Sequence, residues 1–143
     1  MIVVDTNVVS EPLRAAPEPR VAAWLDMQAL ETLYLSAITV AELRFGVRAL
    51  PAGRRRDRLH EDLESQVLPM FAGRVLAFDL APSQAYAELM VRARKAGVAI
   101  SVSDGYIAAT AAANGMMVAT RDTGPFRAAG LKTVDPWTEP HRT

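Results

Sequence analysis

The sequence has no cysteine and very little lysine, and both shortages narrow what the chain can be. Without cysteine it can form neither a disulfide framework nor a thiolate metal site, which fits a reducing compartment without requiring one. Only two of its 16 basic residues are lysines, Lys95 and Lys132, and the rest are arginines. Arginine binds phosphate well, but the same excess follows from a GC-rich genome, so it identifies no ligand by itself.

Long hydrophobic runs are also absent. No apolar stretch approaches the roughly 18 residues that a membrane-spanning helix needs, and the first residues lack the charged and apolar regions of a signal peptide. The 16 basic and 16 acidic residues balance, which argues against a bulk polycation. The 143 residues fit one domain, and because 50% of them are hydrophobic we expect that domain to have a substantial core. Since neither a signal peptide nor a spanning segment is recognised, we expect the protein in the cytoplasm.

Short apolar runs alternate with longer segments of helical periodicity. This alternation predicts an α/β domain whose central sheet is mainly parallel and has about five strands flanked by helices. We expect the domain to span residues 1–138 and residues 139–143 to form a short loose tail. The expected strands are 2–4, 33–35, 75–78, 116–119 and, more weakly, 132–134. The expected helices are 19–30, 40–50, 54–67, 83–96 and 104–114.

Four acidic residues occupy similar places in this pattern. Asp5 directly follows the apolar run 2–4, where an aspartate should mark the end of a buried strand. Glu42 and Asp104 lie at the start of expected helices, and Asp122 comes just after the fourth strand. In an open parallel sheet all such positions face the edge where ligands bind, so these acids are expected to converge.

Each acid also has a purely structural explanation. Thr39 with Glu42 fits a capping box, Ser101 with Asp104 fits another, and Asp122 is a common turn former. As a group, however, clustered carboxylates repel one another unless a cation lies among them. A site made only of oxygen ligands favours Mg²⁺ or Mn²⁺, which can acidify a water and contact phosphate oxygens, as nucleases require.

Four longer segments carry these acids in a recognisable order, namely VVDTNVVSE, SAITVAELRFGV, SVSDGYIAATAAANG and VATRDTGPF followed by VDPW. Together they resemble the PIN-domain ribonucleases, and specifically the FitB-like branch of the VapC-type toxins of toxin–antitoxin pairs. The resemblance implies an RNA-cleaving enzyme that uses Mg²⁺, with Mn²⁺ as the other candidate. Its catalytic residues would be Asp5, Glu42, Asp104 and Asp122, with metal bound chiefly by Asp5 and Asp104. Supporting polar residues would be Thr6, Asn7 and Thr120.

One position departs from the family pattern. Many relatives carry an aspartate directly before the phenylalanine that corresponds to Phe126, whereas this chain has Pro125 there. The loop therefore has one acid instead of two. Asp122 is expected either to contact the metal through water or only to shape the pocket.

The resemblance also implies protein partners, namely a small antitoxin and a second copy of the chain, in a homodimer or a larger assembly. Apolar stripes on 19–30 and 54–67 suit a groove for a helix or an extended tail of the antitoxin. An Arg or Lys of that partner could pair with the acids and compete with the metal. Trp137 and the helix 83–96 are candidates for the self-contact.

Other functions are compatible with parts of the sequence. A phosphotransferase could use Asp5 as an aspartyl-phosphate nucleophile, but Asn7 replaces the expected second aspartate and only Lys132 is available near the phosphate. A non-catalytic binding module with the same fold is a third reading, against which the presence of all four acids argues. The run 54–56, three arginines, could bind a phosphate backbone or simply begin a solvated helix.

Overall fold

A computed structural model describes residues 1–139, and residues 140–143, most of the expected tail, lie outside the described residues. The five expected strands are confirmed, and they form one sheet in the order β3-β2-β1-β4-β5 in which every pairing is parallel. The strands are short: β1 Ile2–Val4, β2 Leu33–Ser36, β3 Val75–Leu76, β4 Met117–Ala119 and β5 Thr133–Val134. The predicted α/β class is therefore correct.

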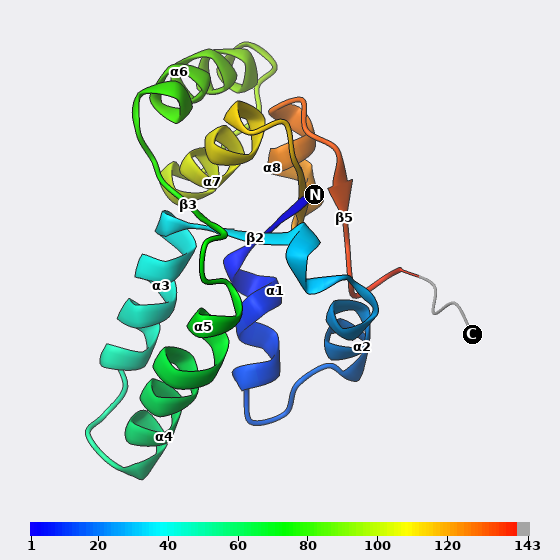
Figure 1. The fold of residues 1–143 in the computed structure, drawn as a ribbon. Coiled ribbons are helices and arrows are strands. Elements are labelled where there is room, and N and C mark those ends of the chain that lie inside the picture. Colours follow the sequence, from blue (N-terminus) through cyan, green and yellow to red (C-terminus); the bar gives the residue numbers. More distant parts are fainter. Residues whose placement is uncertain (140–143) are drawn as a thin grey trace.

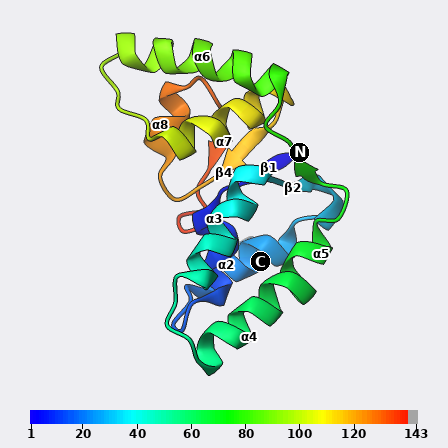
Figure 2. The ribbon, with the colours of Figure 1, turned by 90° about the vertical axis from the view of Figure 1, so that its left-hand side faces the viewer.

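Helices cover both faces of the sheet, as Figures 1 and 2 show. On one face lie α1 Thr6–Ser10, α2 Pro19–Met27, α3 Ala37–Arg48, α4 Arg54–Asp62 and α5 Leu68–Met70. On the other face lie α6 Leu80–Lys95, α7 Val102–Ala113 and α8 Thr123–Ala128. Short turns of other helix types complete the chain: η1 Glu11–Leu13, η2 Leu30–Thr32 and the π turn η3 Leu63–Val67. None of the described helices is long and apolar enough to cross a membrane.

The central strand β1 joins two hydrophobic cores. Val4 packs with residues of α1, α2 and α3, whereas Val3 packs with residues of α6, α7 and α8. Successive residues of a strand point to opposite faces of the sheet, and helices cover both faces here, so both side chains are fully buried. This explains why β1 is apolar throughout and why Asp5, the first residue after it, lies at the covered centre of the sheet edge.

The start of α3 differs from the sequence prediction. The helix begins at Ala37, and the Ser36 hydroxyl caps it by accepting a hydrogen bond from the Thr39 backbone N–H at 3.0 Å. The predicted capping box of Thr39 with Glu42 is therefore wrong, and Glu42 lies in the second turn of the helix. The prediction for α7 is better, since Ser101 caps that helix by accepting from the Asp104 N–H at 3.2 Å.

Three other elements depart from expectation. The predicted helix 54–67 is interrupted by the π turn η3, and the predicted strand 75–78 is only two residues long. The helices α1 and α8 were not predicted. The helix α1 follows the strand β1 after Asp5, and α8 follows the neighbouring strand β4 after residues 120–122. Asp5 and Asp122 therefore lie at the same edge of the sheet.

Candidate active site

Asp5 is the buried member of the acid group, with only 4% of its surface exposed. Its backbone N–H donates to the Ala119 carbonyl at 2.9 Å, which ties the end of β1 to the end of β4. Its carboxylate accepts the Thr6 backbone N–H at 2.7 Å and the Thr120 hydroxyl at 2.8 Å. Each of its two oxygens is thus fixed by one donor, so the carboxylate has a defined orientation.

Glu42 lies between α1 and α7 and contacts both. One of its oxygens accepts the Thr6 hydroxyl at 2.8 Å, and the other accepts the Ser103 hydroxyl at 3.2 Å. The Thr6 hydroxyl also lies 3.0 Å from that of Thr39. Because Ser36 performs the capping of α3, the Glu42 side chain is not used for that purpose and turns toward the other acids.

Asp104 and Asp122 complete the group from the opposite side. Asp104 is in the first turn of α7 and is half-buried, whereas Asp122 is exposed at the N-terminus of α8. The Asp122 side chain makes no capping bond, although its backbone N–H donates to the Thr120 hydroxyl oxygen at 3.2 Å. Thr120 therefore links Asp5 to the loop that carries Asp122.

The electrostatics show that the four acids lie close to one another. Burial raises the pKa of Asp5 to about 6, against the hydrogen bonds from Thr120 and Thr6, and the charges of Asp104 and Glu42 raise it further. Burial also raises the pKa of Asp104, against the Ser101 hydroxyl, and the charges of Asp122 and Glu42 add to the effect. Asp5 and Asp104 thus both feel the charge of Glu42, and Asp104 also feels that of Asp122, whereas the role of the four acids as one metal site stays a prediction.

Among residues 1–139, no cationic side chain forms an ion pair with these acids. The ion pairs within residues 1–139 are Arg14 with Glu11 and Arg44 with Glu64, and neither includes a member of the group. Carboxylates that lie near one another repel, and a cation bound among them would relieve that repulsion.

The donor set fits a hard divalent ion. All four side chains offer oxygen, the ligand that Mg²⁺ and Mn²⁺ prefer. In the part of the chain that the structure describes, no three acidic or histidine side chains converge tightly enough to hold a metal by themselves. Mg²⁺ usually keeps several waters and binds one or two carboxylates, so a looser cluster is compatible with it.

Two contacts of the site were missed by sequence reasoning. Ser103 donates to Glu42, and its only sequence signal is its position directly before Asp104. Arg121 lies between Thr120 and Asp122, and its backbone N–H donates to the Asn7 side-chain oxygen at 3.4 Å.

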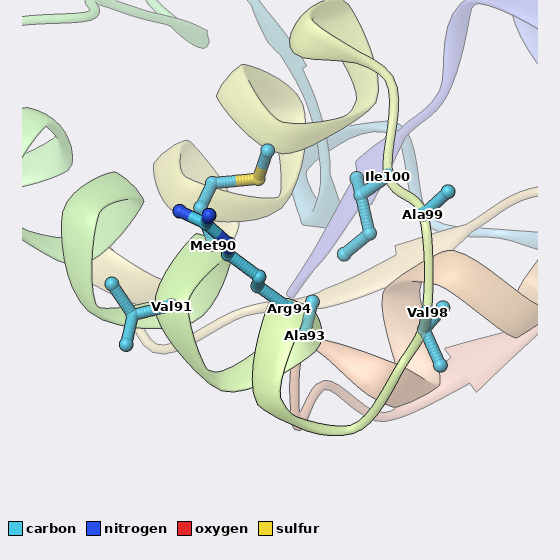
Figure 3. Close-up of a pocket in the computed structure, with 7 residues that line it drawn as sticks. All are labelled: Met90, Val91, Ala93, Arg94, Val98, Ala99 and Ile100. Carbon is cyan, nitrogen blue, oxygen red and sulfur yellow. The ribbon is translucent and has the colours of Figure 1, made fainter.

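Two apolar grooves lie outside the acid group. One lies where α2, η1 and α5 meet, and its walls include Leu25, Leu30 and Val67 from the two predicted stripes. The other lies beside the C-terminal half of α6, the helix predicted to make the self-contact (Figure 3). Its lining residues are Met90, Val91, Ala93, Arg94, Val98, Ala99 and Ile100.

The chain is similar over nearly its whole length to several named proteins. The sequence profile of the PIN domain matches residues 2–131. The VapC ribonuclease Y4jK of Sinorhizobium fredii is 61% identical over 137 residues, which are 96% of this chain and 98% of that protein. Toxin FitB of Neisseria gonorrhoeae is 54% identical, over 96% of this chain and 99% of that protein. The crystal structure of FitAcB from Neisseria gonorrhoeae has a TM-score of 0.94 at 53% identity and covers 97% of this chain and 100% of that chain.

Proposed function

Because this chain belongs to the PIN domain family, we propose that it is a metal-dependent endoribonuclease that acts as the toxin of a toxin–antitoxin pair. The observation that carries the proposal is the convergence of Asp5, Glu42, Asp104 and Asp122 without a cationic partner among the described residues. The names of two close relatives, a VapC ribonuclease and a toxin, agree with it.

In this proposal Asp5 and Asp104 bind the metal directly, and Mg²⁺ is the preferred ion. When bound, such an ion supplies a Lewis acid that acidifies a water and stabilises charge on the phosphodiester. Asp5 suits direct binding because Thr6 and Thr120 fix both of its oxygens. A ligand that is already oriented loses little conformational entropy when the ion binds.

The other two acids have different tasks. Glu42, fixed by the hydroxyls of Thr6 and Ser103, orients water in the shell of the site. Asp122 is exposed and its side chain makes no capping bond, so it can accept the proton of the attacking water and pass it to solvent. Asn7 supports Asp122 indirectly, because it holds the backbone of Arg121.

We also propose the partners and the location. The substrate is RNA, and a small co-expressed antitoxin neutralises the enzyme, with the groove between α2 and α5 as its docking surface. The chain forms a homodimer through the surface of α6 or Trp137, alone or within a larger toxin–antitoxin assembly. The proposed location is the cytoplasm, where its RNA substrate and its antitoxin are made, and the proposed domain boundary is residue 138.

The test is cleavage of single-stranded RNA by the purified chain. We expect cleavage with Mg²⁺ and none with EDTA, and loss of cleavage in Asp104→Asn. Glu42→Gln should also reduce cleavage strongly while the fold stays intact, because a glutamine can still bond to Thr6 and Ser103.

Asp57→Asn is the matched control, since Asp57 is an exposed acid on α4 and should not matter. Full cleavage by folded Asp104→Asn would exclude the proposed metal site. Binding of RNA without cleavage by the wild type would instead support a non-catalytic PIN-fold module.

A further inference from the structure

A second polar pocket lies beyond the acid group, where the end of α1 meets the loop before α2 and the chain after β5. Figure 1 shows the segment after β5 passing beside α2. The pocket contains both acidic and basic side chains and one aromatic ring. Its lining residues are Glu11, Arg14, Ala16, Pro17, Glu18, Arg121 and Trp137.

Glu11 is the buried charge of this pocket, with 5% of its surface exposed. Its carboxylate accepts the Arg14 guanidinium at 3.2 Å and the Glu18 backbone N–H at 3.1 Å. Burial acts to raise the pKa of Glu11, but these two donors and the nearby charge of Arg121 hold it below its usual range. Glu11 therefore remains ionised, and it attracts both arginines to the pocket.

Arg121 is held in a different way. Its guanidinium carbon lies 5.0 Å from the centre of the Trp137 ring, a distance typical of a cation–π contact. The main chain that carries the ring is held in turn, because the backbone N–H of Trp137 donates to the Asp135 carboxylate at 2.9 Å and the Trp137 carbonyl accepts from the Arg20 guanidinium at 3.2 Å. The contact with the ring thus limits the motion of Arg121 without using its N–H groups in a hydrogen bond.

Those N–H groups are the important feature. Within residues 1–139 the Arg121 guanidinium donates to no other side chain or carbonyl, whereas that of Arg14 is bound to Glu11. A guanidinium that lies over an aromatic ring and keeps its N–H groups available can bind phosphate in a bidentate manner. The Arg121 side chain therefore loses little conformational entropy when a phosphate binds.

Arg121 lines this pocket and is also a direct neighbour of the acid group in the chain. It lies between Thr120, which bonds to Asp5, and Asp122, which belongs to the acid group. Glu11, the first residue of η1, follows Asp5 by six residues across α1, which corresponds to roughly 9 Å of helix. A strand bound with one phosphate at the acids can therefore place a neighbouring phosphate at this pocket.

We propose that Arg121, supported by Arg14, binds a backbone phosphate of the RNA strand next to the one that is cleaved. Trp137 and Glu11 are positioning residues that hold the two arginines. The inference rests on the proposed ribonuclease function. A nucleic-acid strand fits this pocket better than an acidic protein does. Arg121 shares its loop with Asp122, so a ligand that reaches both the pocket and the acid group needs phosphates at successive positions along its chain.

The experiment measures the affinity of a short single-stranded RNA of mixed sequence at several salt concentrations. The Asp104→Asn chain serves as the background, because it should bind RNA without cleaving it. Adding Arg121→Ala should weaken binding about tenfold, as expected for the loss of a charge-assisted hydrogen-bonded pair. The slope of log affinity against log salt should fall by about 0.7, the value for one phosphate contact of a single strand.

Two further variants separate geometry from charge. Arg121→Lys retains the charge but not the planar fork, so its affinity should be intermediate. Arg48→Ala removes one exposed arginine from the last turn of α3, which lines neither this pocket nor either apolar groove, and it should change neither affinity nor slope. In the cleaving wild-type background, Arg121→Ala should raise KM and leave kcat nearly unchanged, because a bound neighbouring phosphate contributes equally before and during reaction.

The proposal is wrong if Arg121→Ala behaves like Arg48→Ala in both affinity and salt slope. It is also wrong if Arg121→Ala loses binding to a co-expressed protein partner while its RNA affinity is unchanged. Failure of the ribonuclease function would look different, since the wild type would then bind RNA through Arg121 without cleaving it, and the phosphate subsite would stand.

Discussion

Asp5 is a carboxylate under opposing influences. Two hydrogen bonds stabilise its charged form, but burial and the neighbouring acids outweigh them and raise its pKa from an ordinary 3.8 to about 6. In the folded protein without metal, the neutral form of Asp5 is therefore favoured relative to the unfolded chain. This makes the stability of the metal-free protein depend on pH.

The sign of that dependence follows from the raised pKa. The stabilisation by protonated Asp5 is complete below pH 4 or so and is lost as the pH rises through about 6, a difference of about 3 kcal/mol. Asp5→Asn removes the titrating group and keeps the shape. In EDTA we expect this variant to be more stable than the wild type at pH 7 and nearly equal to it at pH 4, as measured by urea unfolding. Stability profiles that run parallel over this range would contradict the raised pKa.

The positions of the four acids could be predicted from the sequence, whereas the polar residues around them could not. Asp5, Glu42, Asp104 and Asp122 could be identified because each stands at the end or the start of an element with a clear apolar pattern. Ser103 and Arg121 could not, because a serine or an arginine in such a loop is common and only the folded chain shows what its side chain contacts.

The packing of α6 against α7 controls the position of Asp104. Gly105, the next residue, is buried against α6, and a Cβ atom there would lie 2.9 Å from both the Met90 sulfur and the Tyr86 ring. Tyr86 cannot easily move, because its ring also packs against the rings of Phe78 and Tyr106. Any side chain at Gly105 must therefore push α6 and α7 apart.

We expect Gly105→Ala to lower the free energy of unfolding by about 1–3 kcal/mol, the usual range for an overpacked core. Its RNA cleavage should fall as well, because Asp104 moves with the start of α7. The matched control is Gly46→Ala in α3, where the new methyl group meets no atom within 4 Å. Alanine is the better helix former, so this variant should gain up to about 1 kcal/mol. Equal stabilities for the two variants in urea would show that α6 and α7 are not closely packed at Gly105.

At the scale of elements, long regular patterns were predictable and short ones were not. The central strands could be read from uniformly apolar runs, and α6 and α7 from their periodicity and the glycines that end them. The helix α1 is only five residues long, too short to show a period. The helix α8 is only six residues long and contains Gly124 and Pro125, residue types that are common in loops, although proline is compatible with the first turn of a helix.

Two apolar grooves that the described residues form lie on different elements, and we assign them to different partners. Leu30, 42% exposed, lines the groove between α2 and α5, whereas Val91, 52% exposed, lines the groove beside α6. Neither groove includes a member of the acid group. A charge introduced in one groove should therefore disturb one assembly and leave the other intact.

Co-expression with the protein encoded directly upstream tests this assignment. We expect a stable complex that contains two copies of the chain, and growth arrest when the chain is expressed alone. Leu30→Glu should weaken binding of the partner, and Val91→Glu should convert the toxin dimer to a monomer, as measured by light scattering. A monomer that binds no upstream partner and leaves growth unchanged would refute the toxin–antitoxin assignment.

The most direct test of the acid cluster as a metal site is a titration of Mn²⁺ into the metal-free protein, followed by the loss of the free-ion signal in electron paramagnetic resonance. We expect saturable binding at pH 7 that Mg²⁺ displaces, and weaker binding at pH 5, where a proton competes for Asp5. The folded double variant Asp5→Asn/Asp104→Asn should bind no Mn²⁺ in the same range. Binding of equal affinity by the double variant and the wild type would contradict the metal site on which the proposed function depends.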